Sequence, residues 1–267
     1  MDFQDLHSAM SFNIFNWDRS EAHLLRIVAM IKKYSPDTVG FQELTLEWIN
    51  RLLPLLPEYA CIGADREDST HERACIFYRR NEFILLEGGT KWLSDTPDIP
   101  SKFESSQYNR IMTYACLEHG ASGKRLVHAN LHLDLSDPVN QKQVKVALDF
   151  LESHYPTLPR LLSGDFNSCR LDVPLPTTMK EALARMSDSR DLATEKHGTG
   201  TWHGRHSITP EKVILDYIFV SGNITVEKSI FADDLFTQGY PTDSEYEAIN
   251  MGAPSDHFPV YITYRLI

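Results

Sequence analysis

The chain has 267 residues, of which 42% are hydrophobic, so it can bury a sizeable core and is too apolar to be disordered by default. Lysine and arginine number 26 against 37 aspartate and glutamate residues, which gives a formal net charge of −11. Proteins that hold long nucleic acids usually present a basic face to the phosphates. The charge balance therefore argues against a processive or non-specific nuclease.

The four cysteines, at positions 61, 75, 116 and 169, show no C-x-x-C spacing. Three of them lie in apolar, strand-like stretches, so we expect free thiols and neither a disulfide framework nor a zinc site. The first ten residues lack the basic region and apolar run of a signal peptide, and no stretch is long enough to span a membrane. We expect a cytoplasmic monomer that does not contact membranes.

Strand-like and helix-like segments alternate through the first half of the chain. Residues 10–14 alternate apolar and polar side chains, as a strand does, whereas 20–37 carry apolar residues at helical spacing after Ser20, a capping residue type. A short buried strand is predicted at 38–43 and a second helix at 45–53. Further strands are predicted at 58–62, 74–79, 82–93, 111–117 and 124–133.

The second half is predicted to open with a helix at Asp137-Pro138, in which the aspartate caps the helix and the proline takes its first position. A strand at 160–165, a helix at 177–186 and strands at 213–221 and 258–266 follow. The segment 232–254 is long and acidic, which is typical either of a functional loop or of a solvated surface excursion.

No linker rich in proline, serine or glycine divides the chain, so we expect residues 1–267 to form a single domain. Many strands with few helices, not strictly alternating, indicate two packed sheets with helices outside.

Polar residues end or interrupt several predicted strands. In LLSGDFNS (161–168), Asp165 and Asn167 follow an apolar strand and form either a turn or a catalytic pair, since side chains two residues apart on an extended segment face the same side. Aspartate could take a proton or position a water, and asparagine could bond a phosphoryl oxygen. Glu43 in GFQEL either starts the following helix or offers a carboxylate to a hard divalent cation. Asn13 in SFNIF is either an edge residue or a further ligand.

Two histidines have candidate carboxylate partners, because a carboxylate bonded to an imidazole fixes its tautomer and raises its pKa. Glu72, just before a predicted strand, could pair with His132 of NLHLD. A lone ionised Asp216 in the apolar VILDYIFV would be costly, and His257 of SDHFPV is its obvious partner. Arg110 in NRIM could offer a fixed cation to a phosphate, or lie on the surface. Together these residues suit metal-assisted phosphoryl transfer to water.

The order of these motifs resembles the endonuclease/exonuclease/phosphatase superfamily, the deoxyribonuclease-I-like fold, from about Met10 to Arg265. The motifs are FNIFNW, DTVGFQEL, NRIMTYA, NLHLD, SGDFNS, LDYIFVS and SDHFPV. The resemblance implies an α/β (α+β) four-layer sandwich, two packed mixed β-sheets flanked by helices, with the site at one edge of the sheets. KWLSDTP and TWHG further resemble small, mostly bacterial members, in which Trp202 would either line the pocket or pack in the core.

The resemblance also implies a metal site and a base. Glu43 is similar to the residue that holds Mg²⁺ or Mn²⁺, with Asn13 and Asp256 beside the metal. Asp165 resembles the residue that orients or deprotonates the attacking water, and Asn167 the residue that binds the scissile phosphate.

The remaining roles fall to the two histidines and the arginine. His257, supported by Asp216, resembles the general base or the histidine that stabilises the phosphate. His132, backed by Glu72, resembles the second histidine of the deoxyribonuclease-like and deadenylase-like branches, and Arg110 a phosphate-contacting arginine.

The expected function is therefore a divalent-metal-dependent hydrolase of phosphoester substrates. The first expectation is a phosphodiesterase acting on nucleic acid or nucleotide-type substrates. A phosphomonoesterase acting on a small or lipid-derived phosphate is the alternative. A non-catalytic binding module with this fold is the rival from another class, and the presence of all the metal and base positions disfavours it.

Overall fold

The computed structural model describes residues 6–204, 213–233 and 255–267. One sheet is built from β1 (Leu6–Asn13), β2 (Thr38–Gln42), β3 (Tyr59–Ile62), β4 (Ile76–Arg79), β10 (Glu195–His197), β12 (Ile224–Phe231) and β13 (Val260–Leu266). The other is built from β5 (Phe83–Trp92), β6 (Ile111–His119), β7 (Arg125–His132), β8 (Arg160–Asp165), β9 (Ser187–Asp188) and β11 (Asp216–Ser221). The strand orders are β10-β12-β13-β1-β2-β4-β3 and β5-β6-β7-β8-β11-β9, and both sheets mix parallel with antiparallel pairs.

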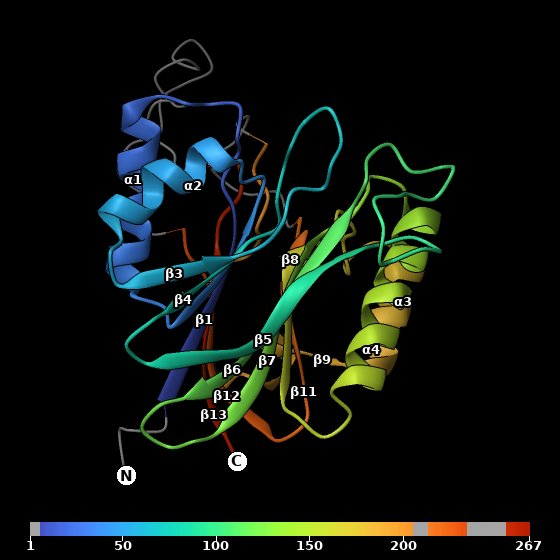
Figure 1. Cartoon of the computed structure of the whole chain (residues 1–267). Helices are drawn as coiled ribbons and strands as arrows, with labels where there is room; N and C mark the ends of the chain where they lie inside the picture. The colour runs from blue at the N-terminus through green and yellow to red at the C-terminus, as the bar shows by residue number, and fades with distance from the viewer. Residues whose placement is uncertain (1–5, 205–212, 234–254) are drawn as a thin grey trace.

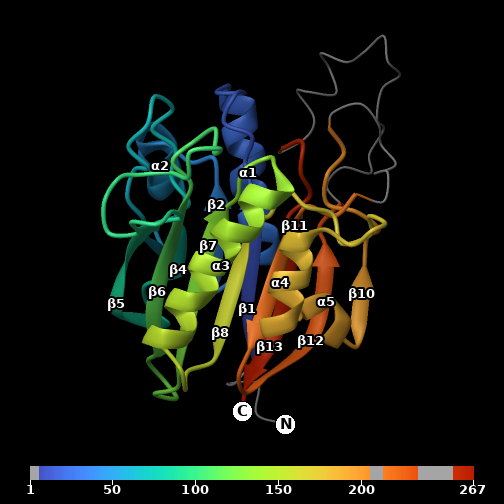
Figure 2. The same ribbon diagram turned by 90° about the vertical axis from the view of Figure 1, so that its right-hand side faces the viewer.

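Helices lie on the outer faces of the two sheets (Figures 1 and 2). They are α1 (Glu21–Tyr34), α2 (Leu46–Leu52) with a 3₁₀ turn at Leu53–Leu55, α3 (Asp137–His154), α4 (Thr177–Arg185) and α5 (Ser189–Leu192). The helices α1 and α2 share a buried core with β1, β2 and β4, whereas α3 and α4 share one with the second sheet. The predicted four-layer sandwich of two mixed sheets flanked by helices is confirmed.

The predicted capping residue is correct for one helix and wrong for another. The Ser20 hydroxyl accepts a hydrogen bond from the backbone N–H of His23 at 3.1 Å, so Ser20 caps α1 as predicted. Asp137, by contrast, lies inside α3 behind the cap residue Ser136. Its carboxylate accepts the N–H groups of Thr177 and Thr178 at 2.9 and 3.0 Å. The aspartate therefore caps the neighbouring helix α4, which a cap prediction restricted to local sequence could not foresee.

The predicted strands are present, with shifted ends. The first begins at Leu6 rather than residue 10, and the strand predicted at 213–221 begins at Asp216. The strands β9, β10 and β12 and the short helix α5 were not predicted. Most of the acidic segment lies outside the described residues. All four cysteines are free thiols, and no described helix combines the length and apolar character needed to cross a bilayer.

The topology gathers strand ends at one edge of the sandwich. Each sheet contains a parallel pair joined through a helix, β1-α1-β2 in one and β7-α3-β8 in the other. Asn13 ends β1, Glu43 follows β2, His132 ends β7 and Asp165 ends β8. The carboxyl ends of parallel strands are where α/β sheets place their ligands. These four polar side chains therefore meet at one edge.

Two further strands, β11 and β13, begin at the same edge. Asp216, the first residue of β11, lies directly opposite Asp165 in the ladder with β8. Strand β13 runs antiparallel to β1 with Val260 opposite Ser11, so the residues just before β13 approach the end of β1. His257 reaches the edge in this way.

A buried polar network ties the two sheets together beneath this edge. The Asn130 amide donates to the backbone carbonyls of Phe41 and Cys75, and its oxygen accepts from Gln42 at 2.7 Å. A Cβ at Gly40 would overlap the side chains of Asn130 and Ser163, so only glycine fits there. The network fixes how the two parallel strand pairs face each other.

Candidate active site

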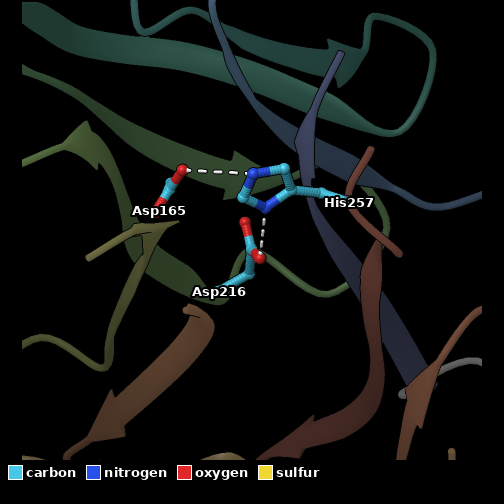
Figure 3. A group of neighbouring side chains, drawn as sticks. All are labelled: Asp165, Asp216 and His257. Atoms are coloured by element: carbon cyan, nitrogen blue, oxygen red, sulfur yellow. Dashed lines mark hydrogen bonds and ion pairs between the residues drawn. The ribbon is translucent and has the colours of Figure 1, made fainter. Parts of the chain in front are cut away.

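A carboxylate–histidine–carboxylate group lies at the centre of the edge (Figure 3). Nδ1 of His257 donates to Oδ2 of Asp216 at 2.8 Å, so the predicted contact is present. Nε2 of the same ring lies 3.7 Å from Oδ2 of Asp165 and 3.9 Å from Oδ1 of Asp256. Burial alone would lower the pKa of His257, but Asp216, Asp256 and Asp165 together raise it well above its ordinary value. In the absence of a cation, this environment favours the protonated imidazole.

The backbone around this group is fixed by short contacts. Ser255 accepts the N–H of His257 at 3.1 Å and donates to the carbonyl of Asn13 at 2.6 Å, which ties the segment to β1. The Thr201 hydroxyl accepts the N–H of Asp216 at 3.1 Å. Trp202 pairs through its backbone with His257 and is 36% exposed, so it flanks the site and is not a core residue.

Asn13 lies between two carboxylates. Its amide nitrogen donates to Oε1 of Glu43 at 3.1 Å and to Oδ2 of Asp165 at 3.0 Å, and its oxygen accepts the N–H of Phe15. In this orientation Asn13 positions the carboxylates and does not itself offer an oxygen to a cation. The other oxygen of Glu43 accepts the N–H of Asn16 at 3.1 Å, and the backbone of Glu43 takes the left-handed φ of +62°. Such a conformation costs roughly 1–3 kcal/mol, so the surrounding contacts hold Glu43 in place.

Asp165 and Asn167 form a turn that also faces the site. Oδ1 of Asp165 accepts the N–H of Asn167 at 2.9 Å, and the Asn167 amide donates to the carbonyl of Leu133 at 3.0 Å. Asn167 has a φ of +46°, so the two-residue alternation of an extended segment, from which we expected the pair to face one side, does not apply. Burial, and then the charge of Asp216, raises the pKa of Asp165 to about 6.

His132 lies beside a small hollow lined mainly by charged side chains. They are Glu43, Arg66, Glu72, Arg73, Arg110 and His132, with Ala74 and Ile111. Nε2 of His132 lies 3.6 Å from Oδ2 of Asp165, the same oxygen that His257 approaches. Burial, then Arg110 and Arg66, lowers the pKa of His132 well below its ordinary value. This imidazole is therefore held neutral.

Glu72 does not form the predicted pair with His132. Its carboxylate lies 2.8 Å from Nη1 of Arg66, and the backbones of the same two residues are joined by a hydrogen bond of 3.0 Å. Arg66 outcompetes the histidine because it is a permanent cation, whereas His132 is kept neutral. Glu72 still lines the hollow together with His132, but its ion-pair partner is Arg66.

Arg110 is buried, which excludes a place on the surface. Each of the predicted site residues therefore either contacts another of them or lines the same hollow. Sequence reasoning missed Arg66, which is 3% exposed, because ADREDSTHER resembles a solvated charged loop. The supporting side chains of Ser255 and Thr201 also gave no signal, since hydroxyls of this kind are common in turns.

The donor set suits a hard divalent cation. Burial, and then repulsion from Glu72 and Asp256, raises the pKa of Glu43 to about 7. Carboxylate oxygens that repel one another in this way match the ligands of Mg²⁺ or Mn²⁺. Asp165, Asp216 and His257 also lie within 4.8 Å of one another, but Asp216 and His257 already engage each other. Glu43 and Asp256, whose charges repel each other, remain the predicted ligands.

Comparison with known proteins agrees with this geometry. A model of the Endonuclease/Exonuclease/phosphatase family matches residues 10–257. An endonuclease/exonuclease/phosphatase from Bacteroides vulgatus is 23% identical with a TM-score of 0.84, over 98% of this chain and 99% of that one. A mannosyl-6-phosphatase from Bacteroides thetaiotaomicron is 26% identical with a TM-score of 0.81, over 96% and 98% of the two chains. The 3′-5′-exoribonuclease subunit Ccr4 of Mycosarcoma maydis is 25% identical over 73% of this chain and 36% of its own length. The chain belongs to the endonuclease/exonuclease/phosphatase family.

Proposed function

We propose that the chain is a divalent-metal-dependent hydrolase that transfers a phosphoryl group to water. Members of its family are phosphoester hydrolases. The observation that carries the proposal is the shared oxygen Oδ2 of Asp165, which lies 3.6 and 3.7 Å from Nε2 of His132 and of His257. A carboxylate flanked by two imidazoles can hold a water and a phosphoryl group side by side.

Glu43 and Asp256 would hold the cation, Mg²⁺ or Mn²⁺, which supplies Lewis-acid stabilisation of charge on the phosphoryl oxygens. Asn13 keeps the Glu43 carboxylate in place through its amide, at 3.1 Å. The role of Asn13 in the metal site is then to position a ligand.

Asp165 would orient the attacking water and take its proton. Its Oδ1 accepts the N–H of Asn167, while Oδ2 accepts from the Asn13 amide and also faces the two imidazoles. His257, anchored through Nδ1 by Asp216, presents Nε2 to the site and would donate to a phosphoryl oxygen. His132 lies 3.6 Å from Oδ2 of Asp165 and Asn167 bonds its Oδ1, and we infer that both would contact the same phosphoryl group.

For the substrate we infer a phosphodiester of the nucleotide type, short enough to suit a chain with a net charge of −11. The similarity to an exoribonuclease subunit supports this choice. A phosphomonoester is the second candidate. It is favoured by the charged hollow beside His132 and by the similarity to a mannosyl-6-phosphatase.

A metal-dependent activity panel tests the proposal. It sets bis-p-nitrophenyl phosphate and short DNA and RNA against phosphomonoesters, with Mg²⁺, Mn²⁺ or a chelator, and with Asp165→Asn as the matched variant. We expect metal-dependent turnover that Asp165→Asn removes. Absence of turnover on every substrate would instead favour the non-catalytic binding module.

A further inference from the structure

The hollow beside His132 contains two buried guanidinium groups on a common support. Arg66 and Arg110 are 3% and 4% exposed. Their guanidinium carbons lie 4.5 and 5.0 Å from the ring centroid of Tyr108, so both arginines pack on one aromatic side chain. Burial, and then the positive charge of Arg66, lowers the pKa of Arg110. Two cations are thus held against one aromatic ring despite their mutual repulsion.

Arg66 is fixed by its own ion pairs. Nε lies 2.8 Å from Oδ2 of Asp68, and Nη1 lies 2.8 Å from Oε2 of Glu72. Its backbone carbonyl accepts from the Trp92 indole at 3.1 Å and from the Asn109 amide at 3.2 Å. The guanidinium is therefore pre-positioned at the hollow before any ligand arrives.

Arg110 has no ion pair as close as those of Arg66. Within the described part of the chain, no carboxylate lies within ion-pairing distance of its guanidinium, and Glu72, Asp134 and Asp165 act on its charge only from farther away. Its buried Nε, like that of Arg66, has no hydrogen-bond partner. A buried charge without a partner is strongly unfavourable. The fold retains this guanidinium beside a second cation, in a hollow that opens next to Glu43 and His132. An anionic ligand in the hollow would supply the missing partner.

We propose that Arg66 and Arg110 form a subsite for a terminal phosphoryl group, a dianion with three non-bridging oxygens. Planar guanidinium groups bind phosphate oxygens in pairs, and two of them together match a dianion better than a singly charged diester. The hollow is far smaller than the pockets that bury drug-sized ligands, so it admits at most one such group and not a nucleoside.

The terminal phosphoryl group has two sources. It is either the reacting phosphate of a monoester or a second, non-reacting phosphate at the end of a nucleotide-type diester. This inference rests on the proposed function, because it assigns the substrate end that lies next to Glu43 and His132.

The test compares two double variants. Arg66→Met/Glu72→Gln removes the cation together with the Glu72 carboxylate that it pairs with, while Asp68 keeps its hydrogen bond from the N–H of Thr70. The control uses an ion pair away from the site. Glu118 and Arg125 lie 2.7 Å apart on β6 and β7, and Arg125→Met/Glu118→Gln makes the same chemical change there.

Calorimetric titration of the metal-free proteins with inorganic phosphate measures the subsite without catalysis. We expect the Arg66→Met/Glu72→Gln variant to bind phosphate roughly 10- to 100-fold more weakly than wild type, the range given by one lost charge-assisted contact. The control variant keeps wild-type affinity. Equal phosphate affinity in wild type and in the Arg66→Met/Glu72→Gln variant would overturn the proposal.

Kinetics with metal then distinguish the two sources. The substrates are p-nitrophenyl phosphate, and thymidine 5′-(p-nitrophenyl phosphate) with and without a 3′-phosphate. A selective fall in kcat/KM for p-nitrophenyl phosphate supports the reacting phosphate, and a lost preference for the 3′-phosphorylated diester supports the second phosphate. An equal fall on all three substrates contradicts the subsite. If wild type hydrolyses none of them, the proposed function fails, and the calorimetry still decides the subsite.

Discussion

The two sides of the site hold the same side chain in opposite charge environments. On the acidic side, Asp165, Asp216 and Asp256 surround His257 and raise its pKa. On the arginine side, Arg66 and Arg110 adjoin His132, whose pKa burial and these two cations lower. The two rings nevertheless approach one oxygen of Asp165. Local charge, and not the net charge of −11, therefore determines what each side can bind.

The sides also differ in how the fold builds them. The acidic side comes from strand ends that the ladders fix directly, since Asp216 lies opposite Asp165 in register. The arginine side comes from the connection between β3 and β4 and from the segment just before β6, held by side-chain ion pairs and by Tyr108. We infer that the acidic side supplies the chemistry common to the family and the arginine side the selection of substrate.

Metal removal is expected to have the largest effect. A chelator should reduce turnover to the background rate, because Glu43 and Asp256 would then face each other without the cation. Mg²⁺ or Mn²⁺ should restore it, and Glu43→Gln should need more metal for half-maximal activity. Turnover that persists after chelation and dialysis would show that the reaction needs no metal.

Asp165 lies next to the histidines of both sides, so we expect its substitution to have a large effect on turnover. Asp165→Asn should lower kcat by at least ~100-fold, the usual contribution of a general acid or base. Circular dichroism and thermal unfolding check that the variant folds. A folded Asp165→Asn protein with wild-type turnover would show that the shared carboxylate is not catalytic.

Asp216 belongs to the acidic side alone. Asp216→Asn removes the charge that Nδ1 of His257 contacts at 2.8 Å. Because a hydrogen bond to a charged group contributes about 1.5–3 kcal/mol, we expect kcat to fall roughly 10- to 100-fold. An unchanged kcat in Asp216→Asn would show that His257 takes no part in the chemical step.

His128 lies in the core below both sides of the site, so we expect it to affect stability and not turnover. Its ring bonds the hydroxyls of Thr38 and Ser163 at 2.9 and 2.8 Å, and burial lowers its pKa to about 3. The unfolded chain binds a proton at His128 more readily than the folded protein does. The free energy of unfolding is therefore undiminished by His128 above pH 6.5 and decreases as the pH falls towards 3. The loss is about 1.4 kcal/mol per pH unit in that window.

Urea unfolding between pH 7 and 5 measures this slope, and His128→Gln provides the comparison. We expect the slope to be shallower in His128→Gln, with turnover little changed at pH 7. Identical slopes in the two proteins would show that His128 is not the titrating group.

The sequence predicted the acidic side better than the arginine side for a physical reason. Asp216 lies in an apolar segment, where an ionised carboxylate needs a partner, and His257 was the available one. Arg66 lies in a charged loop, where the local pattern does not distinguish a buried arginine from a solvated one. The wrong partner for Glu72 followed from that omission.

Prediction of the fold from the sequence has the same limit. Strands and layers followed from apolar periodicity and from the order of the motifs, whereas Asp137 caps a helix that begins forty residues later in the chain. The left-handed backbones of Glu43 and Asn167 are likewise set by tertiary contacts. Contacts of this kind depend on three-dimensional proximity, which one sequence does not encode locally.

The central claim is that one edge of the sandwich holds two histidines in opposite charge states around one carboxylate. Nitrogen-detected NMR of the imidazoles in the metal-free protein, with His132→Gln and His257→Gln for assignment, tests it directly. Between pH 6 and 8 we expect a protonated His257 and a neutral His132. Two rings that titrate together near their ordinary pKa of about 6.5 would contradict it.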